Sequence, residues 1–270
     1  MKDRIIAVTT NCYHGYSVEE AIAGIAAAGF KYVELTAMKG WVEHVFPDNS
    51  FEKLLQVKDL MEQAGLKAIG MSGHVSLLDE TKREDFVKNI RLARFFDIPC
   101  IVTFVGEPAR EGAVVTEADI VEAVRAVVPQ LEKYGIDMAL EVAGKQSSGV
   151  SLKEIVAQVN SPRVSIAYDT ANAIFYGDVD TLADLGACLS QVGYIHIKEK
   201  SAGRQEWSFP ALGQGYVPFP EVFAMVDASD NQSPYVVEIE FTPNGAGSLE
   251  AVNKAVQDSA DYLKAHGFTL

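Results

Sequence analysis

The sequence predicts an α/β protein whose 270 residues form a single (β/α)8 TIM barrel. Three observations support this prediction. Eight short runs rich in β-branched residues recur along the chain, amphipathic stretches separate most of them, and the length suits one barrel. No linker, low-complexity segment or second domain stands out, so we expect residues 1–270 to form one barrel domain.

The eight apolar runs are the expected strands. In chain order they read RIIAVT, KYVELT, KAIGMS, CIVTFV, IDMALEV, RVSIAY, YIHIK and YVVEIEF. Repeated strand–helix units imply parallel strands joined by right-handed crossovers. Eight units favour a closed barrel, and an open doubly wound sheet is the alternative. The open sheet commonly has a glycine-rich phosphate turn after its first strand, and TTNCYHG is not such a turn.

The stretches between the strands carry helix signals. Capping-box spacing places helix starts at Ser17, Thr81 and Ser151, each with a glutamate three residues later. Apolar residues three and four apart predict helices over 19–29 and 119–135, and both of these stretches end on glycine. The intervening segments therefore fit the crossover helices that a barrel needs.

Composition excludes several classes of partner and location. The net charge is −14 and no Lys/Arg cluster offsets it, so nucleic acid is not an expected partner. The apolar run at the N-terminus is too short for a secretory signal, and no run reaches membrane-helix length. Cys12, Cys100 and Cys188 lie far apart without a CxxC pair, which fits a cytoplasmic protein.

Polar residues collect where the predicted strands end, which is where TIM barrels carry their chemistry. In chain order this set is Glu34, His74, Glu141, Asp169, His196, Lys198, Glu238 and Glu240. Side chains alternate along a strand, so His196 and Lys198 share one face, as do Glu238 and Glu240. If the apolar residues between them face the helices, these polar side chains point into the barrel mouth.

Four of these residues predict a metal site. Glu141, Asp169, His196 and one of the two glutamates of the last strand offer oxygen and imidazole ligands, which suit Mn²⁺, Mg²⁺ or Co²⁺. We expect one divalent ion, with Mn²⁺ as the first choice. Carboxylates packed together without a cation would repel and raise one another's pKa. Taken singly, Glu141 also fits a salt-bridged strand end, Asp169 a turn cap and His196 a core histidine.

Six segments of the chain resemble the xylose-isomerase-like TIM barrels, which include ketose 3-epimerases, hydroxypyruvate isomerases and inosose dehydratases. The segments are AAAGFKYVEL, LEVAG, AYDTAN, YIHIKEK, ALGQGYVPFPEVFAMV and SPYVVEIEF, and they follow the family's order. The resemblance implies that Glu141, Asp169, His196 and Glu238 hold one divalent metal, with Glu240 left as the alternative last ligand. The epimerase subgroup often has a histidine where this chain reads DTANA, which weakens the assignment to ketose 3-epimerases.

The resulting hypothesis is a metal-dependent isomerase or epimerase that acts on a small ketose or related polyol through an enediolate. Glu141 and Glu238 are the expected proton-transfer groups. The residues expected to bind substrate are Glu34, His74, Lys198 and Trp207. Trp207 lies in the longest non-helical connection, 199–218, which we expect to cover the site.

Two other functions stay open at this point. A lyase would expel a leaving group from the same enediolate, as in inosose dehydration or the cleavage of a keto-glycoside. A non-catalytic sugar-binding subunit would keep the barrel, although we expect such a protein to have lost some ligand residues. The apurinic-site endonuclease branch shares this barrel, but five histidines and the acidic charge argue against it. We expect a small carbohydrate as substrate, no membrane partner, and possible assembly into a homo-oligomer.

Overall fold

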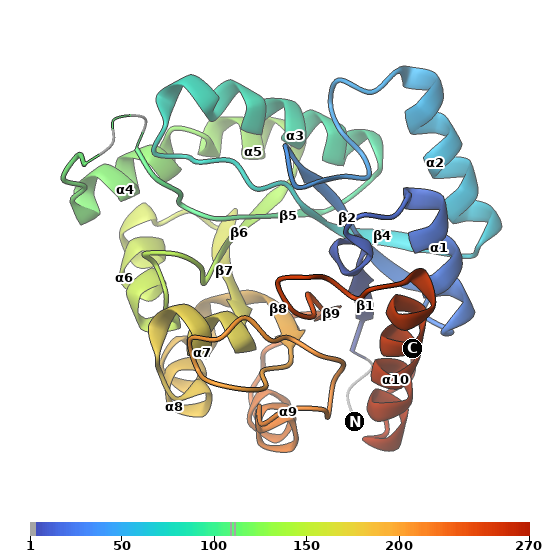
Figure 1. Ribbon diagram of the computed structural model, residues 1–270. Coiled ribbons are helices and arrows are strands. Elements are labelled where there is room, and N and C mark those ends of the chain that lie inside the picture. Colours follow the sequence, from blue (N-terminus) through green and yellow to red (C-terminus); the bar gives the residue numbers. More distant parts are fainter. Residues whose placement is uncertain (1–3, 109, 111) are drawn as a thin grey trace.

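A computed structural model describes residues 4–108, 110 and 112–270 and shows a ring of strands surrounded by helices (Figure 1). Within these residues, eight parallel strands follow the order β1-β2-β4-β5-β6-β7-β8-β9, and β1 also pairs with β9. The ring is therefore closed, which confirms the predicted (β/α)8 barrel. A two-residue strand, β3 (Val42–Glu43), pairs antiparallel with the end of β2 outside the ring.

Each of the eight predicted strands is present. Their bounds are β1 (Ile6–Thr9), β2 (Tyr32–Met38), β4 (Lys67–Ser72), β5 (Cys100–Thr103), β6 (Asp137–Glu141), β7 (Val164–Asp169), β8 (Val192–Lys198) and β9 (Tyr235–Glu238). The last strand ends three residues earlier than the apolar run YVVEIEF predicts.

The helices lie outside the ring (Figure 1). Their bounds are α1 (Val18–Ala27), α2 (Phe51–Gln63), α3 (Arg83–Phe95), α4 (Glu117–Arg125), α5 (Val128–Tyr134), α6 (Gly149–Val159), α7 (Thr170–Gly177), α8 (Thr181–Cys188), α9 (Phe219–Asp227) and α10 (Leu249–Ala265). None of the helices in the described part of the chain has both the length and the apolar character needed to cross a bilayer.

The predicted helix starts are right at one position and wrong at two. Ser17 caps α1 in a full capping box with Glu20. Thr81 lies instead in a short 3₁₀ helix before α3, where its backbone N–H and hydroxyl bond the Asp79 carboxylate. Ser151 is the third residue of α6, because Ser148 adopts the extended conformation of an N-cap and accepts the Ser151 N–H.

The stretch predicted as one helix over 119–135 is two helices, α4 and α5. Pro129 is the second residue of α5, and its missing N–H cannot continue the hydrogen-bond ladder of α4. Gly135 ends α5 at a φ of 66°, a left-handed conformation that favours glycine.

Side-chain alternation divides the core into two clusters. The smaller one fills the barrel interior and consists of Ala7, Ile69, Val102, Ala139, Ala167, Tyr194 and Val236. The residues that alternate with them, such as Ile195 and Val237, pack outward in the larger cluster with the helices. Tyr194 occupies much of the interior, and its hydroxyl lies so close to Gly70 that a Cβ there would approach within 2.0 Å. This layer lies below the strand ends that carry the polar residues.

The predicted covering loop, 199–218, is organised by two buried charged side chains. The Glu199 carboxylate accepts backbone N–H groups from Gly213 and Val217 at 2.9 and 3.0 Å. The Lys200 ammonium donates to the carbonyls of Gly203 and Glu206 at 2.8 and 2.7 Å. Because these bonds tie both ends of the loop together, the loop is a fixed wall at the barrel mouth.

Candidate metal centre and active site

Four side chains converge at the ends of β6, β7, β8 and β9. Glu141, Asp169, His196 and Glu238 each offer one ligand atom, and these atoms lie within 4.8 Å of one another. All four side chains are buried. The structure thus brings together the three residues that the strand ends predicted and Glu238, the last ligand that the family resemblance implies.

Glu240 lies outside this group. It follows the end of β9, and its carboxylate pairs with the Lys198 ammonium at 2.5 Å. Asn11 donates to both glutamates, at 2.7 Å to Glu238 and 3.3 Å to Glu240. Alternation puts the two glutamates on one face, but only Glu238 lies low enough to join the four-residue cluster.

His196 is oriented by carboxylates on both sides. Its Nε2 lies 3.1 Å from Glu34 Oε2, and its Nδ1 lies 2.7 Å from Glu141 Oε1. Ser72 in turn donates to Glu34 at 3.0 Å. Glu34 was expected to bind substrate. It is fully buried, does not line the cavity and contacts His196 instead. A carboxylate behind a histidine fixes the ring so that the other nitrogen can bind a metal.

Two carboxylate oxygens in the cluster are buried without a hydrogen-bond partner among the described residues, Asp169 Oδ2 and Glu238 Oε2. The second oxygen of Asp169 caps α7 by accepting the N–H groups of Ala171 and Asn172 at 2.9 and 2.8 Å. The turn cap and the metal ligand considered for Asp169 therefore use different oxygens. Burying an unpartnered carboxylate oxygen is costly, and a divalent cation would satisfy both. The donor set of three carboxylates and one imidazole fits such an ion.

The pKa values of Asp169 and His196 also reflect the burial of several carboxylates in one place. Burial raises the pKa of Asp169 well above its usual range, and the charges of Glu238 and Glu141 act in the same direction. Burial opposes protonation of His196, but the charges of Glu34 and Glu238 outweigh it and hold its pKa well above the usual value. Without a cation the cluster therefore retains protons that a metal would displace.

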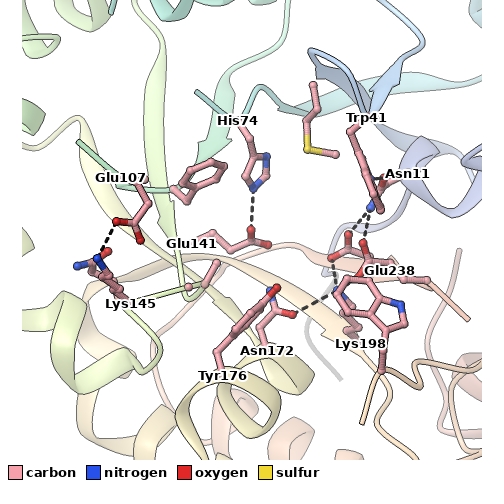
Figure 2. Close-up of a pocket in the computed structure, with 18 of the residues that line it drawn as sticks. Asn11, Trp41, His74, Glu107, Glu141, Lys145, Asn172, Tyr176, Lys198 and Glu238 are labelled. Atoms are coloured by element: carbon pink, nitrogen blue, oxygen red, sulfur yellow. Dashed lines mark hydrogen bonds and ion pairs between the residues drawn. The ribbon is translucent and has the colours of Figure 1, made fainter. Parts of the chain in front are cut away.

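Glu141 behaves differently from Asp169. Burial opposes its ionisation, but His74 and His196 hydrogen-bond to its two oxygens at 2.7 Å and lower its pKa below the usual range. Figure 2 shows His74 directly above Glu141, with the imidazole directed at the carboxylate. Glu141 is therefore ionised and held in place on both sides.

Lys198 is a buried cation beside the cluster. Its Nζ lies 3.7 Å from the Asp169 and Glu238 oxygens that accept no hydrogen bond, and it donates to Asn172 at 3.3 Å. Burial opposes its charge, but Glu238, Glu240 and Asp169 hold its pKa well above the usual range. The ammonium therefore offsets part of the negative charge that these carboxylates concentrate.

A cavity of about 470 Å³ opens above these residues. Its walls include six residues considered in the sequence analysis, namely His74, Glu141, Lys198, Trp207, Glu238 and Glu240. Lining residues that were not expected include Asn11, Met38, Trp41, Phe104, Glu107, Lys145 and Tyr176. Asn11 is the second residue after β1, so the rule that barrel chemistry sits at strand ends would have found it. Trp41 lies beyond the second strand and carried no such signal.

Comparisons with known proteins agree with this architecture. The family model described as "Xylose isomerase-like TIM barrel" matches residues 22–266. An L-ribulose 3-epimerase from Methylomonas sp. (strain DH-1) is 24% identical over 241 residues, which cover 81% of this chain and 77% of that protein. An inosose dehydratase from Geobacillus thermodenitrificans (strain NG80-2) is 26% identical over 121 residues, 39% of this chain and 40% of that protein.

Solved structures share the fold. The crystal structure of a D-allulose 3-epimerase from Methylomonas sp. in complex with D-allulose has a TM-score of 0.76, with 19% identity and 98% of both chains covered. The family match spans nearly all of the barrel, and four of the six motifs that resemble the family lie at β6, β7, β8 and β9, the strands that carry the cluster. The chain belongs to the xylose isomerase-like TIM barrel family.

Proposed function

We propose that the protein is a divalent-metal-dependent isomerase or epimerase that acts on a small, uncharged ketose or related polyol through an enediolate. The observation that carries this proposal is the buried cluster of Glu141, Asp169, His196 and Glu238, in which two carboxylate oxygens accept no hydrogen bond and from which Glu141 and Glu238 line the cavity. A divalent ion held there, with Mn²⁺ as the first choice and Mg²⁺ or Co²⁺ as alternatives, supplies Lewis acidity to a bound carbonyl. The similarity to the L-ribulose 3-epimerase supports the same chemistry.

The two candidate proton-transfer groups lie on separate strands of the cavity. Glu141 ends β6 below His74, and Glu238 ends β9 beside Asn11 (Figure 2). One carboxylate removes the proton from the carbon beside the carbonyl. The other returns a proton to the opposite face or to the neighbouring carbon, which gives epimerisation or isomerisation.

The charges around the cavity favour an uncharged substrate. Three lysines line the cavity, against four glutamates: the Lys145 ammonium is engaged by Glu107 at 2.7 Å, Lys198 is engaged by Glu240 at 2.5 Å, and Lys39 is exposed. Glu141 and Glu238 add two more carboxylates to the lining. A phosphate or carboxylate on the substrate would meet these acidic groups, whereas hydroxyl groups can bond to them.

Proton exchange tests the proposal. The Mn²⁺-loaded protein is incubated in D₂O with a panel of ketoses, and ¹H NMR follows deuterium entry beside the carbonyl. We expect exchange with at least one ketose, and we expect Glu141→Gln to abolish it while Mn²⁺ still binds. Glu52→Gln, which removes an exposed carboxylate at the start of α2, serves as the matched control. Exchange that continues unchanged in Glu141→Gln, or that ignores chelator, would refute the assignment.

A lyase is the second candidate, because the inosose dehydratase is also similar to this chain. Elimination begins with the same proton removal and ends with the loss of a β-leaving group. NMR analysis of products from inososes and 3-keto-glycosides separates the two functions, since a lyase gives an unsaturated product and an epimerase gives a saturated one. A cytoplasmic location, the absence of nucleic-acid and membrane partners, and assembly into a homo-oligomer stay predictions from the sequence.

A further inference from the structure

A second cavity, of about 670 Å³, adjoins the proposed substrate cavity. The two cavities share four lining residues, which are Asn11, Trp41, Trp207 and Glu240. The rest of the second cavity is bounded mainly by residues 12–15 after β1 and by residues 239–246 after β9. Because the cavities meet along this shared edge, a group attached to a sugar over the metal cluster can extend into the second one.

The shared edge carries fixed aromatic rings. The Trp41 side chain is 46% exposed, packs against the His14 ring at 4.2 Å between centroids, and donates its indole N–H to Asn11 at 3.0 Å. Trp207 packs edge-on against Phe209 at 5.1 Å. Aromatic side chains that are held in place but remain accessible offer flat apolar faces to a ring-shaped ligand.

The second cavity has little charge. Among its described lining residues, Glu240 is the only Asp, Glu, Lys or Arg side chain, and Lys198 already neutralises it. Thr242 and Asn244 add exposed hydrogen-bonding groups at the rim. A phosphate or carboxylate would find no lysine or arginine among the described lining residues, whereas an uncharged ring with an apolar face would fit both the rings and the rim.

We propose that the second cavity is a subsite for an uncharged ring joined to the reacting sugar, so that the protein binds glycosylated or aryl-substituted ketoses more tightly than free ketoses. The proposal rests on the proposed function, because the ketose end must lie over the cluster of Glu141, Asp169, His196 and Glu238. The size of the first cavity agrees with the proposed subsite. Its volume of about 470 Å³ by itself falls in the range of pockets that hold drug-sized ligands.

Tryptophan fluorescence tests this subsite directly. The sequence contains only two tryptophans, and both of them, Trp41 and Trp207, border both cavities. The Mn²⁺-loaded protein is titrated with D-fructose, with lactulose, turanose and isomaltulose, which carry a second sugar at different positions, and with a benzyl ether of D-fructose. We expect at least one substituted ketose to bind about fivefold more tightly than D-fructose, a gain typical of aromatic contacts.

Three variants test which residues produce the gain in affinity for the substituted ketose. His14 lines the second cavity, and its ring packs against Trp41. His14→Ala removes this ring, so it should lower the affinity for the substituted ketose to that for D-fructose. Asn244→Ala tests the rim in the same way. Phe51→Ala removes an aromatic ring that is 65% exposed on α2 and lines neither cavity, so it should preserve the gain.

Each outcome has a defined meaning. A gain with the disaccharides assigns the ring as glycosyl, and a gain with the benzyl ether assigns it as aryl. If D-fructose binds and no substituted ketose binds more tightly, the subsite is overturned while the proposed function stands. The subsite is also overturned if the gain survives in both His14→Ala and Asn244→Ala. If no ketose binds or undergoes proton exchange, the proposed function and the subsite fail together.

Discussion

Glu34→Gln is the sharpest test of how the barrel prepares its metal ligand. The substitution keeps the size of the side chain but removes the charge that lies 3.1 Å from His196 Nε2. Loss of such a carboxylate partner typically weakens metal binding about 10–100-fold. Glu34 is fully buried and does not line the cavity, so this effect must pass through His196 and not through contact with substrate.

The expected magnitude follows from linkage. Mn²⁺ at about 100 times its wild-type dissociation constant adds about 2.7 kcal/mol to the free energy of unfolding. A 10–100-fold weaker variant at the same Mn²⁺ concentration gains only about 0.4–1.4 kcal/mol. For a chain of 270 residues, these values correspond to Tm increases of about 5 °C in the wild type and about 1–2.5 °C in the variant.

The assay is thermal unfolding of each protein with and without Mn²⁺, so that any change in the stability of the metal-free variant cancels. Ser72→Ala is the matched control, because it removes one hydrogen bond to Glu34 but leaves the carboxylate facing His196. We expect it to keep most of the increase. An undiminished increase in Glu34→Gln would refute the positioning role, and the absence of any increase in the wild type would refute the metal site.

Three further predictions concern the cluster, the covering loop and the barrel interior. Mn²⁺ binding should strengthen as pH rises, because Asp169 and His196 have raised pKa values without metal and must lose protons to bind it. Calorimetry in buffers of different ionisation enthalpy should detect the released protons, and pH-independent binding would contradict this. Lys200→Met should lower the free energy of unfolding by about 2–4 kcal/mol in urea, since it removes the charged hydrogen bonds that the Lys200 ammonium donates to two carbonyls of the loop. Gly70→Ala should cost about 1–3 kcal/mol, because its Cβ would lie 2.0 Å from the Tyr194 hydroxyl.

Two controls keep the stability predictions specific. Lys153→Met also removes an ammonium that donates to a backbone carbonyl, but this lysine is only half-buried and its hydrogen bond is exposed, so its loss should cost much less than that of Lys200. Gly186→Ala adds a methyl group in α8 at an ordinary 3.6 Å from Met225 and should be neutral or stabilising. If Lys200→Met and Lys153→Met lowered the free energy of unfolding equally, the surroundings of Lys200 would not be the cause of the loss. The same holds for Gly70→Ala and Gly186→Ala.

Much of the candidate site was readable from the sequence because parallel strands impose a simple geometry. The carboxyl ends of β6, β7 and β8 meet at one rim, so Glu141, Asp169 and His196 had to come near one another once the strands were identified. The helix starts were less certain. The sequence predicted a start at Ser151, whereas the structure places the N-cap of α6 at Ser148, whose backbone is extended.

The sequence by itself determined the barrel, through the spacing of its apolar runs, and the strand ends that carry acidic and imidazole groups. The tertiary structure decided which groups meet. Glu238 and Glu240 are equivalent by alternation, and the early end of β9 together with the Lys198 ammonium separates them. Glu34, which we expected to contact substrate, is the partner of His196. Trp41 and Trp207 both lie at the edge that the two cavities share. Such distances between segments far apart in the chain depend on packing across the barrel, which local sequence patterns do not encode.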